Sequence, residues 1–126
     1  LTLNNLIDKN RKPFVEKSSS FLKIIDEISS NMYGATAVIQ DNIIVGVITD
    51  GDIRRVIEKK QNIENISASD FMNKNPKIMT ENTLAIEALK HMKENRISQV
   101  LIIDSSNVYL GIVHILDIIK EGVNNE

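Results

Sequence analysis

The apolar positions of the first half of the chain change from a helical spacing to a strand spacing. The residues that recur every three to four positions are Phe21, Ile24, Ile25, Ile28 and Met32. This spacing predicts a helix with one apolar face, and the serine hydroxyl groups at 18–20 offer an N-cap before it. Gly34 is predicted to end this helix as a left-handed C-cap.

Runs of β-branched residues come next and predict strands. Ala37–Ile39 and Ile43–Ile48 flank the polar segment 40–42, a sequence typical of a hairpin turn. Another short strand is predicted at Pro13–Glu16, before the first helix. A second helix is expected directly after the hairpin, from about Asp52 to Lys60.

The second half of the chain predicts the same order of elements. Pro76–Met79 predicts a short strand, Val100–Ile103 and Val108–Val113 predict a hairpin, and Ile115–Gly122 predicts a last helix. Between them a helix is expected with Asn82 or Thr83 as its N-cap and with an apolar face formed by Leu84, Ala85, Ala88, Leu89 and Met92. The segment 61–67 is predicted to be a connector, and 124–126 a frayed tail.

This repetition extends to individual residues. The segment from Gly46 to Arg55 returns as the segment from Gly111 to Lys120, and each copy has an Asp six positions after its Gly. Two copies of one supersecondary unit, each too small to bury its apolar face alone, are expected to pack on each other. A cleft between two like halves is where a ligand is expected, so the pattern favours a binding module over an enzyme.

Composition and charge narrow the function classes. The 126 residues are 42% hydrophobic and 25% charged, which is typical of a globular protein of one domain or two fused half-domains. A net charge of −2 argues against nucleic-acid binding, which depends on clustered Lys and Arg. The absence of Cys excludes disulfides and zinc–cysteine sites and fits a reducing, cytoplasmic compartment. No apolar run approaches the roughly 20 residues that span a membrane, and the first residue, Leu1, suggests a piece excised from a longer protein.

Candidate chemistry gathers where the first hairpin meets the second helix. Thr49 and Asp52 flank the start of that helix, where free backbone amides and the positive end of the helix dipole can hold a phosphate. The Thr49 hydroxyl can donate to a phosphate oxygen, and the Asp52 carboxylate can accept from ribose hydroxyls. Gly51 leaves the approach free of a side chain.

Two other interpretations of this segment remain open. Asp50 or Asp52 can simply cap the helix, which needs no ligand. Alternatively, Asp50 and Asp52 can hold Mg²⁺ in a small phosphate-handling enzyme, although such enzymes use further carboxylates and a Lys for which this chain offers few positions. No arrangement of Ser, His and Asp or of Cys and His suggests a catalytic site, and the two histidines make a weak case for a metal site.

The repeated plan of strand, helix, strand, strand and helix, closed by Gly-hydrophobic-hydrophobic-Thr-x-x-Asp, resembles a tandem pair of CBS domains, also called a Bateman module. The resemblance covers roughly Leu3 to Val123. The segments 34–38, 46–55, 70–76 and 111–114 are similar to the C-terminal CBS pair of arabinose 5-phosphate isomerases of the KpsF/GutQ type. The resemblance implies an α+β fold with pseudo-twofold symmetry, in which domains at 1–62 and 68–123 each pack a small three-stranded sheet with two helices.

The resemblance also implies which residues hold a ligand. Thr49 and Asp52 match the phosphate- and ribose-facing residues of the first copy, and Asp117 matches the ribose-facing residue of the second. His114 departs from the usual Thr or Ser, which leaves the second site altered or empty. Further residues expected to line the cleft by this resemblance are Phe14, Val15, Thr36, Ala37, Ile78, Met79 and Ser98. From the sequence itself, Arg96 can line the cleft, and Arg54 or Arg55 can reach an anionic ligand, with a solvated basic face as the alternative.

The function implied by the resemblance is regulation. A noncatalytic pair of this kind binds an adenosine nucleotide, or CMP-Kdo as the end product of the isomerase pathway, and passes its occupancy to an upstream sugar isomerase domain. It requires no cofactor or metal, forms a homodimer through its helices, and has neither nucleic acid nor membrane as a partner. The alternative is a structural oligomerisation module with no ligand, favoured by His114 and by the lack of a Gly-rich loop.

Overall fold

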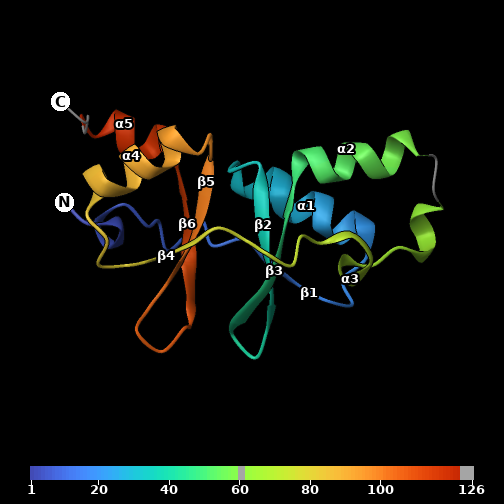
Figure 1. Ribbon diagram of the computed structural model, residues 1–126. Helices are drawn as coiled ribbons and strands as arrows, with labels where there is room; N and C mark the ends of the chain where they lie inside the picture. Colours follow the sequence, from blue (N-terminus) through green and yellow to red (C-terminus); the bar gives the residue numbers. More distant parts are fainter. Residues whose placement is uncertain (60–61, 123–126) are drawn as a thin grey trace. The chain divides into compact units, whose positions relative to one another are not determined.

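The computed structural model describes residues 1–59 and 62–122 and divides the chain into two compact units (Figure 1). One unit consists of Pro13–Pro76 and is called here the continuous unit. The other combines Leu1–Lys12 with Lys77–Glu126 and is called the discontinuous unit. Each unit contains one three-stranded sheet and its own apolar core.

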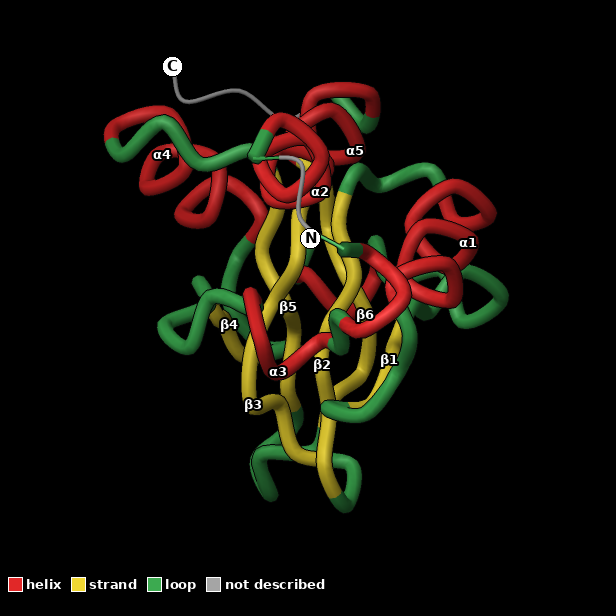
Figure 2. The backbone as a smooth tube through the Cα atoms, turned by 90° about the vertical axis from the view of Figure 1, so that its right-hand side faces the viewer, coloured by secondary structure: helices red, strands yellow, loops and turns green. Residues whose placement is uncertain are grey.

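The sheet of the continuous unit has the order β1-β2-β3. Strand β1 (Phe14–Glu16) runs parallel to β2 (Ala35–Gln40), and β2 pairs antiparallel with β3 (Ile43–Thr49). Asp41 and Asn42 connect β2 to β3 with φ values of 53° and 67°, as a two-residue hairpin turn requires. The predicted hairpin is therefore confirmed, and β3 runs from this turn to Thr49. Figure 2 shows the turn at one end of the strands and the helix that follows β3 at the other.

Two of the helices of the continuous unit were predicted from apolar spacing. Helix α1 (Phe21–Asn31) begins after Ser20, whose hydroxyl accepts a hydrogen bond from the Lys23 amide at 3.2 Å. Helix α2 (Asp50–Glu58) begins directly after β3, and its predicted end at Lys60 lies outside the described residues. The core between sheet and helices is formed by Val15, Ile24, Ile28, Val38, Ile48 and Ala68.

The C-cap of α1 differs from the prediction. Met32 rather than Gly34 ends the helix in the left-handed conformation, with φ 61°. Gly34 also has a left-handed φ of 73°, but it lies two residues further on, in the connection to β2. Met32 adopts this conformation because its amide still closes the last helical turn on the Ile28 carbonyl.

The segment after α2 contains short helices that apolar spacing did not predict. A 3-10 turn at Ile63–Asn65 (η2) leads to α3 (Ala68–Phe71), which is fixed to the continuous unit by backbone hydrogen bonds to the carbonyls of Lys17 and Ser19. Beyond α3, Asn73 pairs with Val47 of β3 through two backbone hydrogen bonds of 2.9 and 3.0 Å. Four-residue helices carry too little periodicity to be recognised from spacing.

The discontinuous unit has the same sheet topology, in the order β4-β5-β6. Strand β4 (Ile78–Thr80) is parallel to β5 (Gln99–Ile103), which pairs antiparallel with β6 (Tyr109–His114). The helices are α4 (Ala85–Glu94) and α5 (Ile115–Lys120), so α5 ends before the predicted Gly122. The predicted tail at 124–126 lies outside the described residues.

The N-cap predicted for α4 is wrong. Leu84 occupies this position and makes no side-chain capping bond, while the Thr83 hydroxyl contacts the Thr80 hydroxyl at 3.1 Å. The first turn of α4 is instead closed by the N-terminal segment of the chain. The Ala85 amide donates to the Leu1 carbonyl at 2.8 Å, which replaces the missing side-chain cap.

This N-terminal segment is an integral part of the discontinuous unit. A 3-10 turn at Leu3–Asn5 (η1) brings the Leu3 amide to the Thr83 carbonyl and the Asn4 amide to the Glu81 carbonyl, both at 2.9 Å. The Leu3 side chain is fully buried in a core with Ala85, Ala88, Leu89, Met92, Val100, Ile102, Val113 and Ile118.

The compact units therefore differ from a linear division of the chain at 1–62 and 68–123. Residues 1–12 contribute Leu3 to the core of the second repeat, and α3 contributes Ala68 to the core of the first. The spacing of apolar residues located the two repeats, but it does not show against which of the two cores residues 1–12 pack. In both units the predicted α+β class, with three strands and two principal helices, is confirmed.

Candidate functional site

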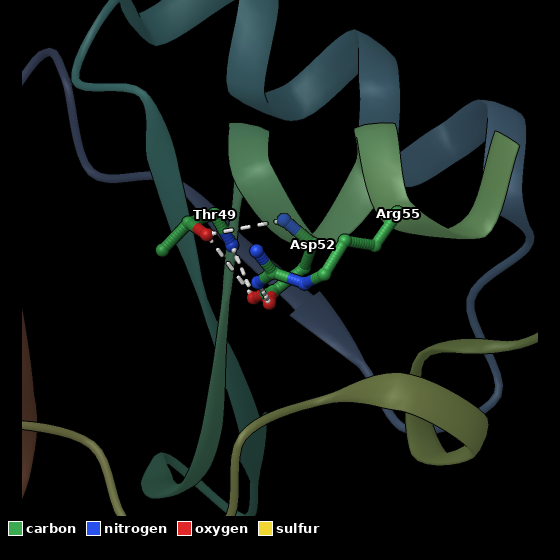
Figure 3. Close-up of polar contacts among 3 residues, drawn as sticks. All are labelled: Thr49, Asp52 and Arg55. Atoms are coloured by element: carbon green, nitrogen blue, oxygen red, sulfur yellow. Dashed lines mark hydrogen bonds and ion pairs between the residues drawn. The ribbon is translucent and has the colours of Figure 1, made fainter. Parts of the chain in front are cut away.

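The start of α2 is organised by a capping box between Thr49 and Asp52 (Figure 3). The Asp52 amide donates to Thr49 Oγ1 at 3.3 Å, and the Thr49 amide donates to Asp52 Oδ2 at 2.9 Å. The Thr49 hydroxyl also donates to Asp52 Oδ2, at 3.2 Å. The two residues predicted to hold a ligand therefore lie side by side and also carry out the capping role that was the alternative interpretation.

Arg55 joins this pair from one turn further along α2. Its Nη2 contacts Asp52 Oδ1 in an i, i+3 ion pair, so both carboxylate oxygens of Asp52 have partners (Figure 3). The Asp52 side chain is 18% exposed and that of Arg55 is 60% exposed. The pair can therefore open toward solvent without exposing the core.

The strand residues predicted for this site lie at the same end of the sheet. Thr49 pairs with Ala35 at the start of β2, which places Thr36 and Ala37 one and two positions further along. Phe14 of β1 pairs with Ala37. Thr36 is fully buried, and its hydroxyl donates to the Ala37 carbonyl at 3.2 Å.

Val15 follows Phe14 in β1, and its side chain belongs to the core of the continuous unit. Only its backbone is available to a ligand, as the prediction of a strand-edge contact requires. Phe14, Val15, Thr36 and Ala37 thus lie on adjacent strands close to the Thr49 end of the sheet, and their role in binding stays a prediction.

The equivalent position of the discontinuous unit has a different chemistry. The His114 amide donates to Asp117 Oδ2 at 2.9 Å, and His114 Nδ1 accepts from the Leu116 amide at 3.1 Å. A ring nitrogen that accepts carries no hydrogen, so the neutral imidazole has its hydrogen on Nε2. His114 replaces the threonine both as the helix cap and as a hydrogen-bond donor.

The remaining predicted residues of this unit lie just before β5, which is next to His114, or on β4, at the far edge of the sheet. His114 pairs with Gln99, and the Ile115 amide donates to the Ser98 carbonyl at 2.8 Å. Arg96 precedes this strand in a left-handed conformation, with φ 55°. Ile78 and Met79 belong to β4, where they pair with the β5 residues Leu101 and Ile102.

Two hollows are present on the continuous unit. A pocket of about 300 Å³ beside α2 is lined by Asp52, Arg55, Val56, Lys59, Asp70 and Phe71. A groove of about 460 Å³ near the β2–β3 turn is lined by Phe14, Glu16, Lys17, Ser18, Ile39, Gln40, Asp41 and Asn42. The first contains the Asp52–Arg55 pair, so it extends the site predicted around Thr49.

Some features of the site were missed by sequence reasoning. The box of Thr49 and Asp52 recurs at Ser67 and Asp70, where the Ser67 amide donates to Asp70 Oδ2 at 2.8 Å, and the spacing of these residues was the available signal. The Asp52–Arg55 pair was also missed.

Among residues 1–59 and 62–122 no cluster of three or more His, Asp or Glu side chains is suited to a metal ion, so Asp50 and Asp52 have no further carboxylate to complete a Mg²⁺ site. The described helices are also too short or too polar to cross a membrane.

The repeated sheet, its strand-to-helix capping boxes and the sequence itself define the class of this protein. Residues 7–59 and 68–124 match the CBS domain family, and the chain therefore belongs to this family, with two copies of the domain.

Two relatives that are more than 30% identical to this chain are arabinose 5-phosphate isomerases. KdsD of Francisella tularensis is 36% identical over 121 residues, which cover 95% of this chain and 37% of that protein. KpsF of Escherichia coli is 34% identical over 106 residues, which cover 83% of this chain and 32% of that protein. The chain thus spans about a third of the length of these relatives and is homologous to the CBS region that they contain.

Solved structures share the fold at lower identity. A CBS domain protein from Pyrobaculum aerophilum, crystallised in complex with AMP, superimposes with a TM-score of 0.82. It is 16% identical, and the match covers 93% of this chain and 89% of that protein. This likeness confirms the predicted fold of a tandem CBS pair.

Proposed function

We propose that this chain is the nucleotide-sensing regulatory region of an arabinose 5-phosphate isomerase and is itself noncatalytic. The observation that carries the proposal is the grouping of Thr49, Asp52 and Arg55 at the first turn of α2, in a family that includes an AMP complex. A phosphate is bound by Arg55 and by the positive end of the α2 dipole, while Asp52 accepts hydrogen bonds from ribose hydroxyls.

The ligand class follows from the charges of these groups. One cation and a helix N-terminus favour an anionic group, and a carboxylate nearby favours a hydroxyl donor, which together describe a nucleotide. An adenosine nucleotide is supported by the AMP-bound neighbour, and CMP-Kdo is the alternative that the isomerase relatives suggest. His114 Nε2 and Asp117 offer a similar donor and acceptor in the discontinuous unit, for a second ligand with a weaker anion requirement.

The regulatory role rests on the relatives, which are about three times as long as this chain. A ligand that binds one conformation of the pair more tightly shifts the population toward it, and an upstream isomerase domain responds to that shift. A homodimer through the helices and a cytoplasmic location belong to the same proposal.

A structural oligomerisation module without a ligand is the second candidate. It is favoured by large apolar side chains exposed on helices, among them Ile57, Leu116 and Ile119. It is also favoured by the capping boxes, because Thr49, Asp52, His114 and Asp117 already have hydrogen-bond partners without any ligand.

Ligand binding distinguishes the two candidates. The chain is titrated calorimetrically with AMP, ATP, CMP and CMP-Kdo, and its melting temperature is measured with each ligand. A ligand at about 100 times its Kd stabilises the folded state by about 2.7 kcal/mol, which raises the melting temperature by several degrees. The Asp52→Ala variant is expected to lose about tenfold or more in affinity, since hydrogen bonds to charged groups contribute about 1.5–3 kcal/mol.

Asp50→Ala is the matched control, because Asp50 is an exposed carboxylate in the same turn of α2 without a capping bond. It is expected to bind the nucleotide as tightly as the unmodified chain does. An equal loss of affinity in both variants would show that the effect is not specific to Asp52. The absence of binding and of any thermal shift with all four ligands would favour the structural module.

A further inference from the structure

We propose that Arg55 makes the site at Thr49 and Asp52 selective for phosphorylated ligands. The Arg55 guanidinium pairs with the Asp52 carboxylate until the phosphate of a ligand takes the place of Asp52 as its partner. This inference rests on the proposed nucleotide site and adds to it the group that decides between a nucleotide and the corresponding nucleoside. Its basis is the position of the guanidinium group beside Asp52 (Figure 3).

The first step concerns the hydrogen-bonding capacity of Asp52. Oδ2 accepts from both the amide and the hydroxyl of Thr49, and Oδ1 is paired with Arg55 Nη2. The oxygen that Thr49 leaves free for a ligand diol is therefore the one that Arg55 contacts. A ligand hydroxyl reaches Oδ1 fully only when the guanidinium moves away from it.

The second step concerns the place where the guanidinium group lies. A Cβ atom at residue 51 would be 3.4 Å from Arg55 Nη1 and 3.7 Å from Thr49 Oγ1, so the cation lies over the first turn of α2. An anion that approaches the positive end of the α2 dipole therefore meets Arg55 at the same point.

These two positions link the phosphate to the diol. A phosphate provides a new partner for the guanidinium and so releases Asp52 Oδ1 to the ligand hydroxyls. A neutral nucleoside offers no such partner and must break the ion pair without replacing it. The pocket of about 300 Å³, which both Asp52 and Arg55 line, gives the displaced guanidinium a place on the same side of α2.

The second repeat lacks this arrangement. Lys120 replaces Arg55, Leu116 replaces Gly51, and the ion pairs found within residues 1–59 and 62–122 do not include one between Lys120 and Asp117. Phosphate selectivity of this kind is therefore confined to the continuous unit.

The test compares AMP with adenosine by titration calorimetry on this chain. AMP is expected to bind at least about tenfold more tightly than adenosine. In Arg55→Met this preference is expected to fall by about tenfold, because AMP loses its charged partner while adenosine binds as well as before or better. Arg55→Lys, which keeps one charge, is expected to retain part of the preference.

Arg54→Met is the matched control, since Arg54 is a neighbouring cation of α2 that pairs with Glu58 at 3.9 Å. It is expected to leave both affinities unchanged. An unaltered preference in Arg55→Met, or an equal loss of affinity for both ligands, would overturn the inference.

The same data separate this inference from the proposed function. If Asp52→Ala weakens AMP binding but Arg55→Met keeps the preference, the site stands and only the role of Arg55 is wrong. If Asp52→Ala binds AMP as the unmodified chain does, or if neither AMP nor adenosine binds, the proposed site itself is wrong.

Discussion

Leu3 is the most informative position for testing the architecture, because it precedes the whole continuous unit in the sequence and yet is fully buried in the core of the other unit. Leu3→Ala removes a side chain packed among Leu89, Met92 and the other core residues of the discontinuous unit. Leu→Ala changes in cores cost about 2–5 kcal/mol, through lost apolar burial and the cavity that remains. We expect a loss of about 3 kcal/mol in the free energy of unfolding, which corresponds to a fall of about 10 °C in melting temperature.

The assay is urea denaturation followed by circular dichroism, combined with hydrogen exchange. Amide protection is expected to fall in α4, whose first turn is closed by the Leu1 carbonyl, before it falls in the strands of the continuous unit. Leu1→Ala is the control, because Leu1 is 58% exposed, and it is expected to cost less than about 0.5 kcal/mol. A cost for Leu3→Ala as small as that of Leu1→Ala would refute the assignment of the N-terminal segment to this core.

Substitutions at three further positions test local features, each measured by urea denaturation. Gly46→Ala is expected to destabilise the chain by about 1–3 kcal/mol, because a Cβ there would lie 2.7 Å from Met72 Sδ and 3.1 Å from the Asn73 carbonyl oxygen. An unchanged stability would contradict this close approach of Met72 and Asn73 to Gly46. Met32→Gly is expected to stabilise it by about 1 kcal/mol, since the left-handed conformation at this 80%-exposed residue costs a non-glycine about 1–2 kcal/mol; a loss would show that Met32 is held by contacts. Thr49→Ala is expected to cost about 1 kcal/mol through the lost N-cap, and Thr49→Ser to recover most of it. Equal stability of the two variants would show that the hydroxyl group does not contribute to the cap.

The predictable part of the fold was the part that depends on neighbours in sequence. The period of α1 and the turn residues Asp41 and Asn42 fixed a helix and a hairpin, because both signals act within a few residues. The assignment of Leu3 to the second core was not predictable, since it depends on packing against residues more than seventy positions away. The N-cap position of α4 at Leu84 was missed for the same reason, because the first turn of this helix is closed by a hydrogen bond from the Ala85 amide to the distant Leu1 carbonyl.

The site was predictable in position but not in its internal contacts. Thr49 and Asp52 were located by a spacing that suits both a cap and a ligand, and the structure confirms that the two side chains meet. The contact between Arg55 and Asp52 depends on the side-chain conformation of Arg55, which an i, i+3 spacing permits but does not require.

The discontinuous unit also imposes an order on folding. Pro13–Pro76 is one uninterrupted stretch, so its sheet can form as soon as that stretch has left the ribosome. The other sheet gains its full core only when Leu3 meets α4, which requires a loop of the whole intervening chain to close. Prior folding of the continuous unit shortens the free chain in that loop and so lowers the entropy that its closure costs. Residues 1–12 thus leave the ribosome before Pro13–Pro76 and yet reach their final partners after it.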